Sequence, residues 1–272
     1  MSTTVHTPAA TRPPMDPMRR RSMAAGILYL ITFVSIPSLA LYKPAKDQVG
    51  DFVLGAGSDT GVMWAALSEV VVGLAGIGTA IVLFPVLKRQ SETPALGFVA
   101  ARIVETTLIF AGVISILSIV TLRNDVAGSA GADPAALVTT AQAHLATYNW
   151  TFLLSGSLAP VFCDLFLGYL LYRSGLVPRI LAIIALVGAP LLLASDVAVF
   201  FGINANVSPI ALLAALPVAA FEFSLGVYLI VKGFQASSPL MTRRTSDVGM
   251  PAPVPAPRAG ADQRDDRGVD VS

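Results

Sequence analysis

The sequence predicts an all-α integral membrane protein, a bundle of six transmembrane helices, from three observations. Of the 272 residues, 54% are hydrophobic and 13% are charged, and the mean hydropathy is +0.72. Soluble domains average about 45–50% apolar and about 25% charged residues, so this composition excludes a water-soluble enzyme, a disordered chain and a disulfide scaffold. Second, six apolar segments are each about as long as a helix that crosses a bilayer. They cover residues 23–41, 62–87, 95–122, 151–172, 180–201 and 210–231.

The third observation is the uneven distribution of basic residues, which predicts the orientation. Of the 18 Lys and Arg residues, 14 lie on the side of the two termini, three lie on the opposite side, and Arg102 lies inside a span. Because cytoplasmic loops carry an excess of Lys and Arg, both termini are expected in the cytoplasm. An even number of spans independently requires both termini on one side.

The chain is expected to divide into a membrane domain and two tails. Residues 1–18 are predicted to be a disordered cytoplasmic arm, residues 19–235 to hold the six spans, and residues 236–272 to be a disordered Pro/Ala-rich cytoplasmic tail. The first span also resembles a signal peptide, with the small residues Ser38 and Ala40 at a cleavage-like site. Its 19 apolar residues exceed the usual stretch of about 7–15, which favours a retained helix.

Local signals mark the expected helix starts and the membrane interface. Thr93 and Ser208 each precede a proline, the pattern of an N-cap followed by Pro at the first helical position. Residues 133–147 are expected as a short helix, either packed on the bundle or lying on the outer surface. The longest segments, 62–87 and 95–122, are expected to tilt or to project beyond the bilayer. An outer aromatic belt is expected from Trp64, Tyr148 and Trp150.

Six ionisable side chains fall within the spans: Glu69, Arg102, Glu105, Asp164, Asp196 and Glu222. Each charge near the bilayer centre costs about 2.5–3.5 kcal/mol on insertion scales, so these groups are expected to face the bundle interior. Arg102 and Glu105 are three residues apart and share a helix face, so Arg102 is expected to pair with an acid, Glu105 first, with Asp164 or Glu222 as further partners. Since one base accompanies five acids, several acids are expected to be protonated or to hold a cation.

An acid precedes a glycine by four residues three times: Glu69–Gly73, Asp164–Gly168 and Glu222–Gly226. Acid and glycine then share a face, where a neighbouring helix can approach closely. Close packing is therefore expected at Gly73, Gly76, Gly168 and Gly226. Pro190 and Pro217 are expected either to kink their helices passively or to free carbonyl groups for a ligand.

No catalytic residue, metal site or cofactor is predicted. The single cysteine, Cys163, stands among apolar residues and is expected to be a small buried side chain. His6 and His144 lie outside the spans and are too isolated to hold a metal. No P-loop, zinc-protease or dinucleotide-binding motif occurs. The protein is therefore not expected to be an enzyme, with an intramembrane enzyme built on carboxylates alone as the exception.

Six motifs in this order resemble one family. They are Gly26-Ile-Leu-Tyr-Leu-Ile31, Leu83-Phe-Pro-Val-Leu-Lys88, Arg102-Ile-Val-Glu105, Leu167-Gly-Tyr-Leu-Leu-Tyr-Arg-Ser174, Leu176-Val-Pro-Arg179 and Gly188-Ala-Pro-Leu-Leu-Leu-Ala194. The chain between Arg19 and Gln235 resembles the bacterial membrane family called domain of unknown function 4386. The resemblance implies a multi-pass protein of the bacterial cytoplasmic membrane. It implies no catalytic or ligand-binding residue, because the family has no established activity.

The six intramembrane ionisable groups allow two interpretations. Either they form structural hydrogen bonds between helices, or they line a polar pocket or a path for protons or cations. The first functional hypothesis is a small transport or permeation protein in which the buried acids bind a proton or cation. The alternative is a non-transporting subunit that docks a partner through its helix faces or its tails. The lipid bilayer is an expected partner, nucleic acid is not, and a homo-oligomer or another membrane partner is left open.

Overall fold

A computed structural model describes residues 15–33, 35–205 and 208–241. All regular elements in these ranges are helical. Within them, six helical segments are long and apolar enough to cross a membrane: Pro17–Asp47, Thr60–Leu87, Glu92–Val126, Pro134–Ser174, Arg179–Phe200 and Pro209–Val231. The prediction of an all-α bundle with six spans is confirmed, and the chain is an integral membrane protein. The outer parts of the two predicted tails, residues 1–14 and 242–272, lie outside the described residues.

The first span is built from short pieces, whereas one helix was expected over residues 23–41. The pieces are α1 (Pro17–Thr32), α2 (Ser35–Ser38), η1 (Leu39–Tyr42), α3 (Lys43–Asp47) and α4 (Val49–Val53). Pro37 accounts for the end of α1, because in a continuous helix its ring would meet the carbonyl of Phe33, four residues earlier. The first span therefore changes direction at the level of Thr32 and Phe33.

Two long helices form the next hairpin, α5 (Thr60–Leu87) and α6 (Glu92–Thr121), and α6 continues as the π-helical turn η2 (Leu122–Val126). The N-cap of α6 is Ser91, so the expected start at Thr93 is wrong by two residues. Pro94 then lies in the first turn, where its missing N–H has no intrahelical partner to lose. The 35 residues of this span extend about 52 Å, well beyond a hydrocarbon core of about 30 Å. The span must project or tilt, as its length predicts.

The fourth span is longer than expected because the separate loop helix does not exist. Helix α7 (Pro134–Leu153) continues through the π-helical turn η3 (Leu154–Leu158) into α8 (Ala159–Ser174). Asp133 caps α7, since its Oδ1 accepts a hydrogen bond from the Ala135 N–H at 3.0 Å. The π-helical turn precedes Pro160, whose ring would meet the Gly156 carbonyl in a regular helix. His144 lies inside α7, not in a loop.

The last two spans are α9 (Arg179–Phe200) and α10 (Pro209–Val231). Ser208 caps α10 as the sequence predicts, because its Oγ accepts a hydrogen bond from the Ala211 N–H at 3.1 Å. Both helices continue past their internal prolines, Pro190 and Pro217. These prolines therefore interrupt neither span.

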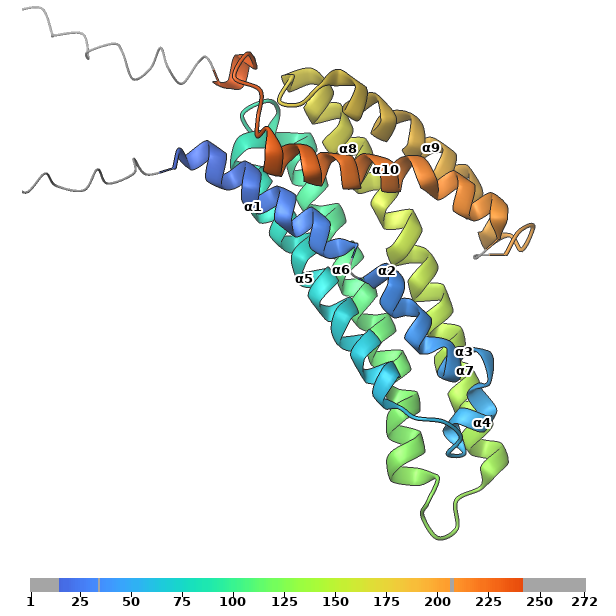
Figure 1. The fold of residues 1–272 in the computed structure, drawn as a ribbon. Coiled ribbons are helices and arrows are strands. Elements are labelled where there is room, and N and C mark those ends of the chain that lie inside the picture. The colour runs from blue at the N-terminus through green and yellow to red at the C-terminus, as the bar shows by residue number, and fades with distance from the viewer. Residues whose placement is uncertain (1–14, 34, 206–207, 242–272) are drawn as a thin grey trace, which may run out of the picture.

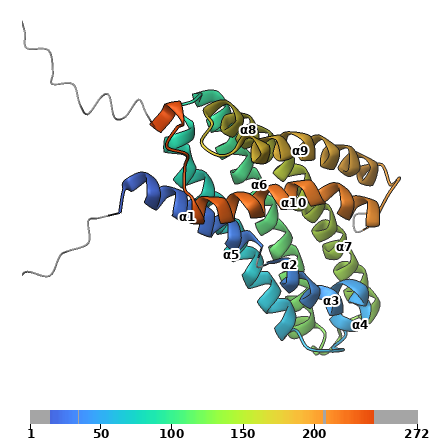
Figure 2. The same cartoon turned by 45° about the horizontal axis from the view of Figure 1, so that its top comes forward.

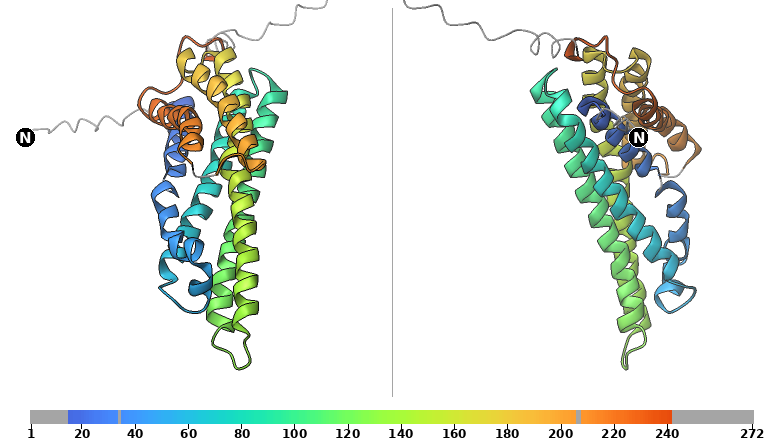
Figure 3. Two further views of the ribbon diagram at one scale, coloured as in Figure 1. Left: turned by 90° about the vertical axis from the view of Figure 1, so that its right-hand side faces the viewer. Right: turned by 60° about the vertical axis from the view of Figure 1, so that its left-hand side comes forward.

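The helices form two overlapping halves of unequal composition (Figures 1 and 2). At the end where the described chain begins and ends, α1, α8, α9 and α10 pack with the near halves of α5 and α6. At the other end, α5, α6 and α7 extend past α9 and α10, and the short helices α2–α4 lie beside them (Figure 3). Each half has its own buried apolar core, one around Tyr29, Phe98 and Phe221 and the other around Phe52 and Ile116.

Small residues allow the close helix contacts that the acid–glycine spacing predicts. A Cβ added to Gly73 would lie 2.8 Å from the Phe110 ring, and one added to Gly168 would lie 3.0 Å from the Ala185 Cβ. Helices α1 and α10 approach most closely, because a Cβ on Gly26 would lie 2.5 Å from the Gly226 carbonyl oxygen. At Gly76 the predicted close packing is not found, since an added Cβ would lie 3.7 Å from the nearest atom, an ordinary van der Waals distance.

The segment after α10 packs back onto the bundle. The Gln235 N–H donates to the Leu176 carbonyl at 2.8 Å, and the Ser238 hydroxyl donates to the Ser174 carbonyl at 2.7 Å. The side chain of Leu240 is buried. Residues 236–241, which the sequence assigns to a disordered tail, are therefore ordered against the α8–α9 turn.

Candidate functional site

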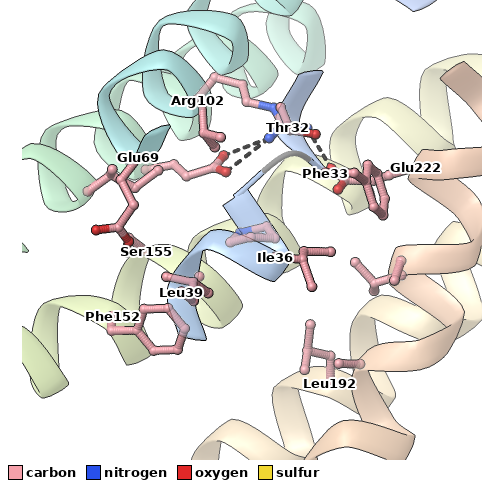
Figure 4. A pocket seen from close by; sticks show the side chains of 18 residues that line it. Thr32, Phe33, Ile36, Leu39, Glu69, Arg102, Phe152, Ser155, Leu192 and Glu222 are labelled. Carbon is pink, nitrogen blue, oxygen red and sulfur yellow. Dashed lines mark hydrogen bonds and ion pairs between the residues drawn. The ribbon is translucent and has the colours of Figure 1, made fainter. Parts of the chain in front are cut away.

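A cavity of about 270 Å³ lies inside the bundle, and all six spans contribute to its wall. Its ionisable residues are Glu69 on α5, Arg102 and Glu105 on α6, and Glu222 on α10. On α6, Arg102 and Glu105 lie between the two apolar cores, since Phe98 belongs to one core and Ile116 to the other. The remaining wall is mainly apolar and includes Phe33, Ile36, Leu39, Phe152 and Leu192 (Figure 4). We call this cavity the central pocket.

Two irregular parts of the spanning backbone border the central pocket. Thr32 and Phe33 at the end of α1 line one side, and Ser155 and Gly156 of the π-helical turn line another. Irregular backbone at membrane depth is tolerated where it is buried in protein or lines a cavity. Single π-helical turns inside α-helices also occur frequently at functional sites.

Arg102 forms a buried ion-pair network at one end of the pocket. Its Nη1 donates to both carboxylate oxygens of Glu105, at 3.0 and 2.9 Å, and its Nη2 donates to Glu222 Oε1 at 2.7 Å. Nη2 also lies 3.4 Å from the Tyr29 hydroxyl. Only 2% of the Arg102 side chain is exposed. The predicted pairing with Glu105 is confirmed, Glu222 is a second partner, and Arg102 does not extend to the membrane interface.

Glu69 occupies the other side of the pocket with different partners. The Tyr42 hydroxyl donates to Glu69 Oε2 at 2.7 Å, and the Tyr148 hydroxyl lies 3.5 Å from Oε1. Figure 4 shows Glu69 near Ser155, with Ile36 and Leu39 between it and Glu222. The network around Arg102 and the carboxylate of Glu69 thus face one cavity from two sides.

The two tyrosines beside Glu69 differ from the sequence-based expectation. Tyr148 was predicted in the outer aromatic belt, but it is buried and turned toward Glu69. Trp64 and Trp150 are exposed on the surface, as a belt requires, and Trp150 contacts the Phe200 ring at 5.6 Å between centroids. Tyr42 was not identified from the sequence, because it lies beyond the expected end of the first span.

Asp164 and Asp196 do not line the central pocket. Asp164 on α8 is fully buried, and neither of its carboxylate oxygens has a hydrogen-bond partner among the described residues. Asp196 on α9 accepts a hydrogen bond from the Ser157 hydroxyl of the π-helical turn. Four of the six predicted residues therefore meet in one pocket, while the other two are buried apart from it.

Cys163 is buried, as the sequence predicts, but it also touches the charged network. Its Sγ donates to Glu105 Oε2 at 3.3 Å. Glu105 thereby receives hydrogen bonds from both Arg102 and Cys163. No signal in the sequence predicts this contact, because the two residues are 58 positions apart.

The comparisons with known proteins bear on the family alone. Residues 24–233 match a family described as "Domain of unknown function (DUF4386)". No curated protein and no solved structure matches the chain.

Proposed function

We propose that this chain, which belongs to the DUF4386 family, is a transport or permeation protein whose central pocket binds a proton or a cation, and that it is not an enzyme. One observation carries the proposal. A single cavity inside the membrane bundle is walled by all six spans and holds three carboxylates but one arginine. If all four groups are ionised, the pocket carries excess negative charge in a medium where charge is costly. A bound proton or cation would offset it.

The backbone around the pocket supports a binding site. In many secondary transporters, substrate and ion sites lie where spanning helices are interrupted. Here the end of α1 and the π-helical turn η3 both border the pocket.

Asp164 supports proton binding in particular. A fully buried carboxylate without a hydrogen-bond partner would cost far more free energy than the neutral acid. We therefore propose that Asp164 carries a proton.

The proposed location is the bacterial cytoplasmic membrane with both termini in the cytoplasm. Arg19, near the start of α1, donates to the carbonyls of Leu229 and Ile230 at the end of α10, at 3.0 and 2.5 Å. The start of the first span and the end of the last span therefore lie side by side. The unequal distribution of basic residues supports the cytoplasmic side for this end.

Proteoliposomes test the transport proposal directly. A valinomycin-induced potential is applied across vesicles that contain a pH-sensitive or a sodium-sensitive dye. Wild-type protein should carry protons or Na⁺ faster than protein-free vesicles. Glu222→Gln or Asp164→Asn should reduce this flux severalfold, while Glu92→Gln, an exposed carboxylate at the start of α6, should not. Absence of flux, or flux that Glu222→Gln and Asp164→Asn both leave intact, would contradict transport and favour the alternative of a non-transporting subunit.

A further inference from the structure

The carboxylates of the central pocket are unequally neutralised. Glu105 and Glu222 both form ion pairs with Arg102. Glu69 has tyrosine hydroxyls as partners, and among the described residues no basic group lies within 4.0 Å of its carboxylate. Lys46 lies close by, but its ammonium is placed over the aromatic rings of Tyr148 and Phe152, 5.0 and 5.3 Å from their centroids. Among the described residues, Glu69 is therefore the pocket carboxylate without an ion-pair partner within 4.0 Å.

The pocket wall beside Glu69 consists mainly of apolar side chains and offers few oxygen atoms that could bind a metal ion. Ile36, Leu39 and Phe152 line this part of the pocket, and Ser155 adds one hydroxyl. Calcium prefers about 6–8 oxygen ligands, and magnesium about six. An ammonium group attached to an apolar body matches this mixture of one carboxylate and apolar side chains better than Ca²⁺ or Mg²⁺ does.

The cavity volume limits the size of the occupant. The volume of the central pocket is about 270 Å³. Ligand pockets for small molecules commonly begin at about 300 Å³. A single aromatic ring or a short alkyl chain with one amine fits this volume.

We infer that the central pocket takes a small organic amine, with its ammonium group at Glu69 and its apolar body against Ile36, Leu39 and Phe152. This inference rests on the pocket of the proposed function and names the class of its ligand. The ammonium donates to the Glu69 carboxylate, for which Tyr42 already fixes one oxygen at 2.7 Å. The Arg102 network at the other side of the pocket keeps its own charges paired.

A direct binding measurement tests the inference with radiolabelled 2-phenylethylammonium as the probe. The detergent-purified full chain is attached to beads, and bound label is counted against unlabelled competitors. We expect saturable binding that unlabelled 2-phenylethylammonium displaces. The neutral isostere 2-phenylethanol and the anion phenylacetate should fail to displace it at the same concentration. Equal displacement by the alcohol would show a merely apolar site and would overturn the inference, as would absence of saturable binding.

A matched pair of variants tests whether the ammonium group binds at Glu69. Glu69→Gln keeps the size and the hydrogen bond from Tyr42 but removes the charge, so we expect affinity for the amine to fall about tenfold or more. Glu92→Gln removes an exposed carboxylate and should leave the affinity unchanged. Unchanged affinity in Glu69→Gln would overturn the placement at Glu69. The competitor series on wild-type protein decides the ligand class even if Glu69→Gln fails to fold.

The binding result and the flux result separate the two proposals. Amine binding without any flux would uphold the ligand class and contradict transport. Proton or Na⁺ flux without amine binding would uphold transport and contradict the ligand class. Transport of the labelled amine into proteoliposomes would support both.

Discussion

Replacing Arg102 should destabilise the protein more than any other single change at the central pocket. Arg102→Met retains much of the side-chain volume and removes the charge that Glu105 and Glu222 share. Removal of one partner from a buried ion pair costs about 3–5 kcal/mol, because it leaves an uncompensated buried charge. With the Arg102 side chain 2% exposed, water cannot replace the lost partner. We therefore expect Arg102→Met to lower the free energy of unfolding by about 3–5 kcal/mol.

The assay is thermal unfolding of the purified protein in detergent. For a domain of this size, 1 kcal/mol corresponds to about 2–4 °C in melting temperature. Arg102→Met should therefore lower the melting temperature by about 6–20 °C. Arg20→Met, which removes an exposed arginine of α1, is the control and should change it little.

A test of additivity among Arg102, Glu105 and Glu222 shows more sharply whether their ion pairs stabilise the fold. Adding Glu105→Gln and Glu222→Gln to Arg102→Met removes the stranded carboxylates, so the triple variant should be more stable than the sum of the single losses predicts. Residues in one ion-pair network show coupling energies of about 0.5–3 kcal/mol. If the losses add within about 0.5 kcal/mol, or if Arg102→Met behaves like Arg20→Met, the network does not stabilise the fold and the reasoning is refuted.

Three other predictions concern the topology, the helix contacts and the loop before α5. Reporter fusions after Arg123 and after Lys232 should report opposite sides of the membrane, outside and inside respectively; the same side for both would contradict the topology. Gly26→Ala places a Cβ 2.5 Å from a carbonyl oxygen of α10 and should lower the free energy of unfolding by about 1–3 kcal/mol. In Gly76→Ala the new Cβ lies 3.7 Å from the nearest atom, so this variant should be neutral or stabilising in thermal unfolding. Arg123 donates to the carbonyls of Gly55 and Gly57 at 3.0 and 2.5 Å, so Arg123→Gln should accelerate proteolysis at residues 55–57, and equal cleavage rates would show that these bonds do not order the loop.

Local rules predicted the parts of the fold that depend on neighbouring residues. The hydropathy of each segment located all six spans, because apolar length alone decides whether a helix can cross a bilayer. The spacing of Arg102 and Glu105 predicted their ion pair, since residues three apart meet on one helix face. The cap at Ser208 followed from a single side chain before a proline.

Backbone irregularities were missed because hydropathy is insensitive to them. Pro37 ends the regular helix of the first span, and Pro160 is accommodated by a π-helical turn, yet α9 and α10 continue past Pro190 and Pro217. The rule that proline disrupts a helix applies equally to all four, and packing with neighbouring helices decides the outcome. The sequence therefore could not predict which prolines border a pocket.

Long-range partners in the site were only partly predictable. The sequence proposed both Asp164 and Glu222 as further partners of Arg102, and the structure places Glu222 in the ion pair and leaves Asp164 without a hydrogen bond. Tyr148 was assigned to the membrane interface because its type and position fit an aromatic belt. Its contact with Glu69 depends on how α7 packs against α6 and α4, which no local pattern specifies.

Charge displacement in proteoliposomes on a solid-supported membrane tests most directly whether cations bind within the membrane at these carboxylates. A rapid increase in the concentration of 2-phenylethylammonium should give a saturable transient current in the wild type and in Glu92→Gln. The double variant Glu69→Gln/Glu222→Gln should give the current of protein-free vesicles. An undiminished current in the double variant, or no current in the wild type, would contradict binding of the ammonium ligand in the central pocket.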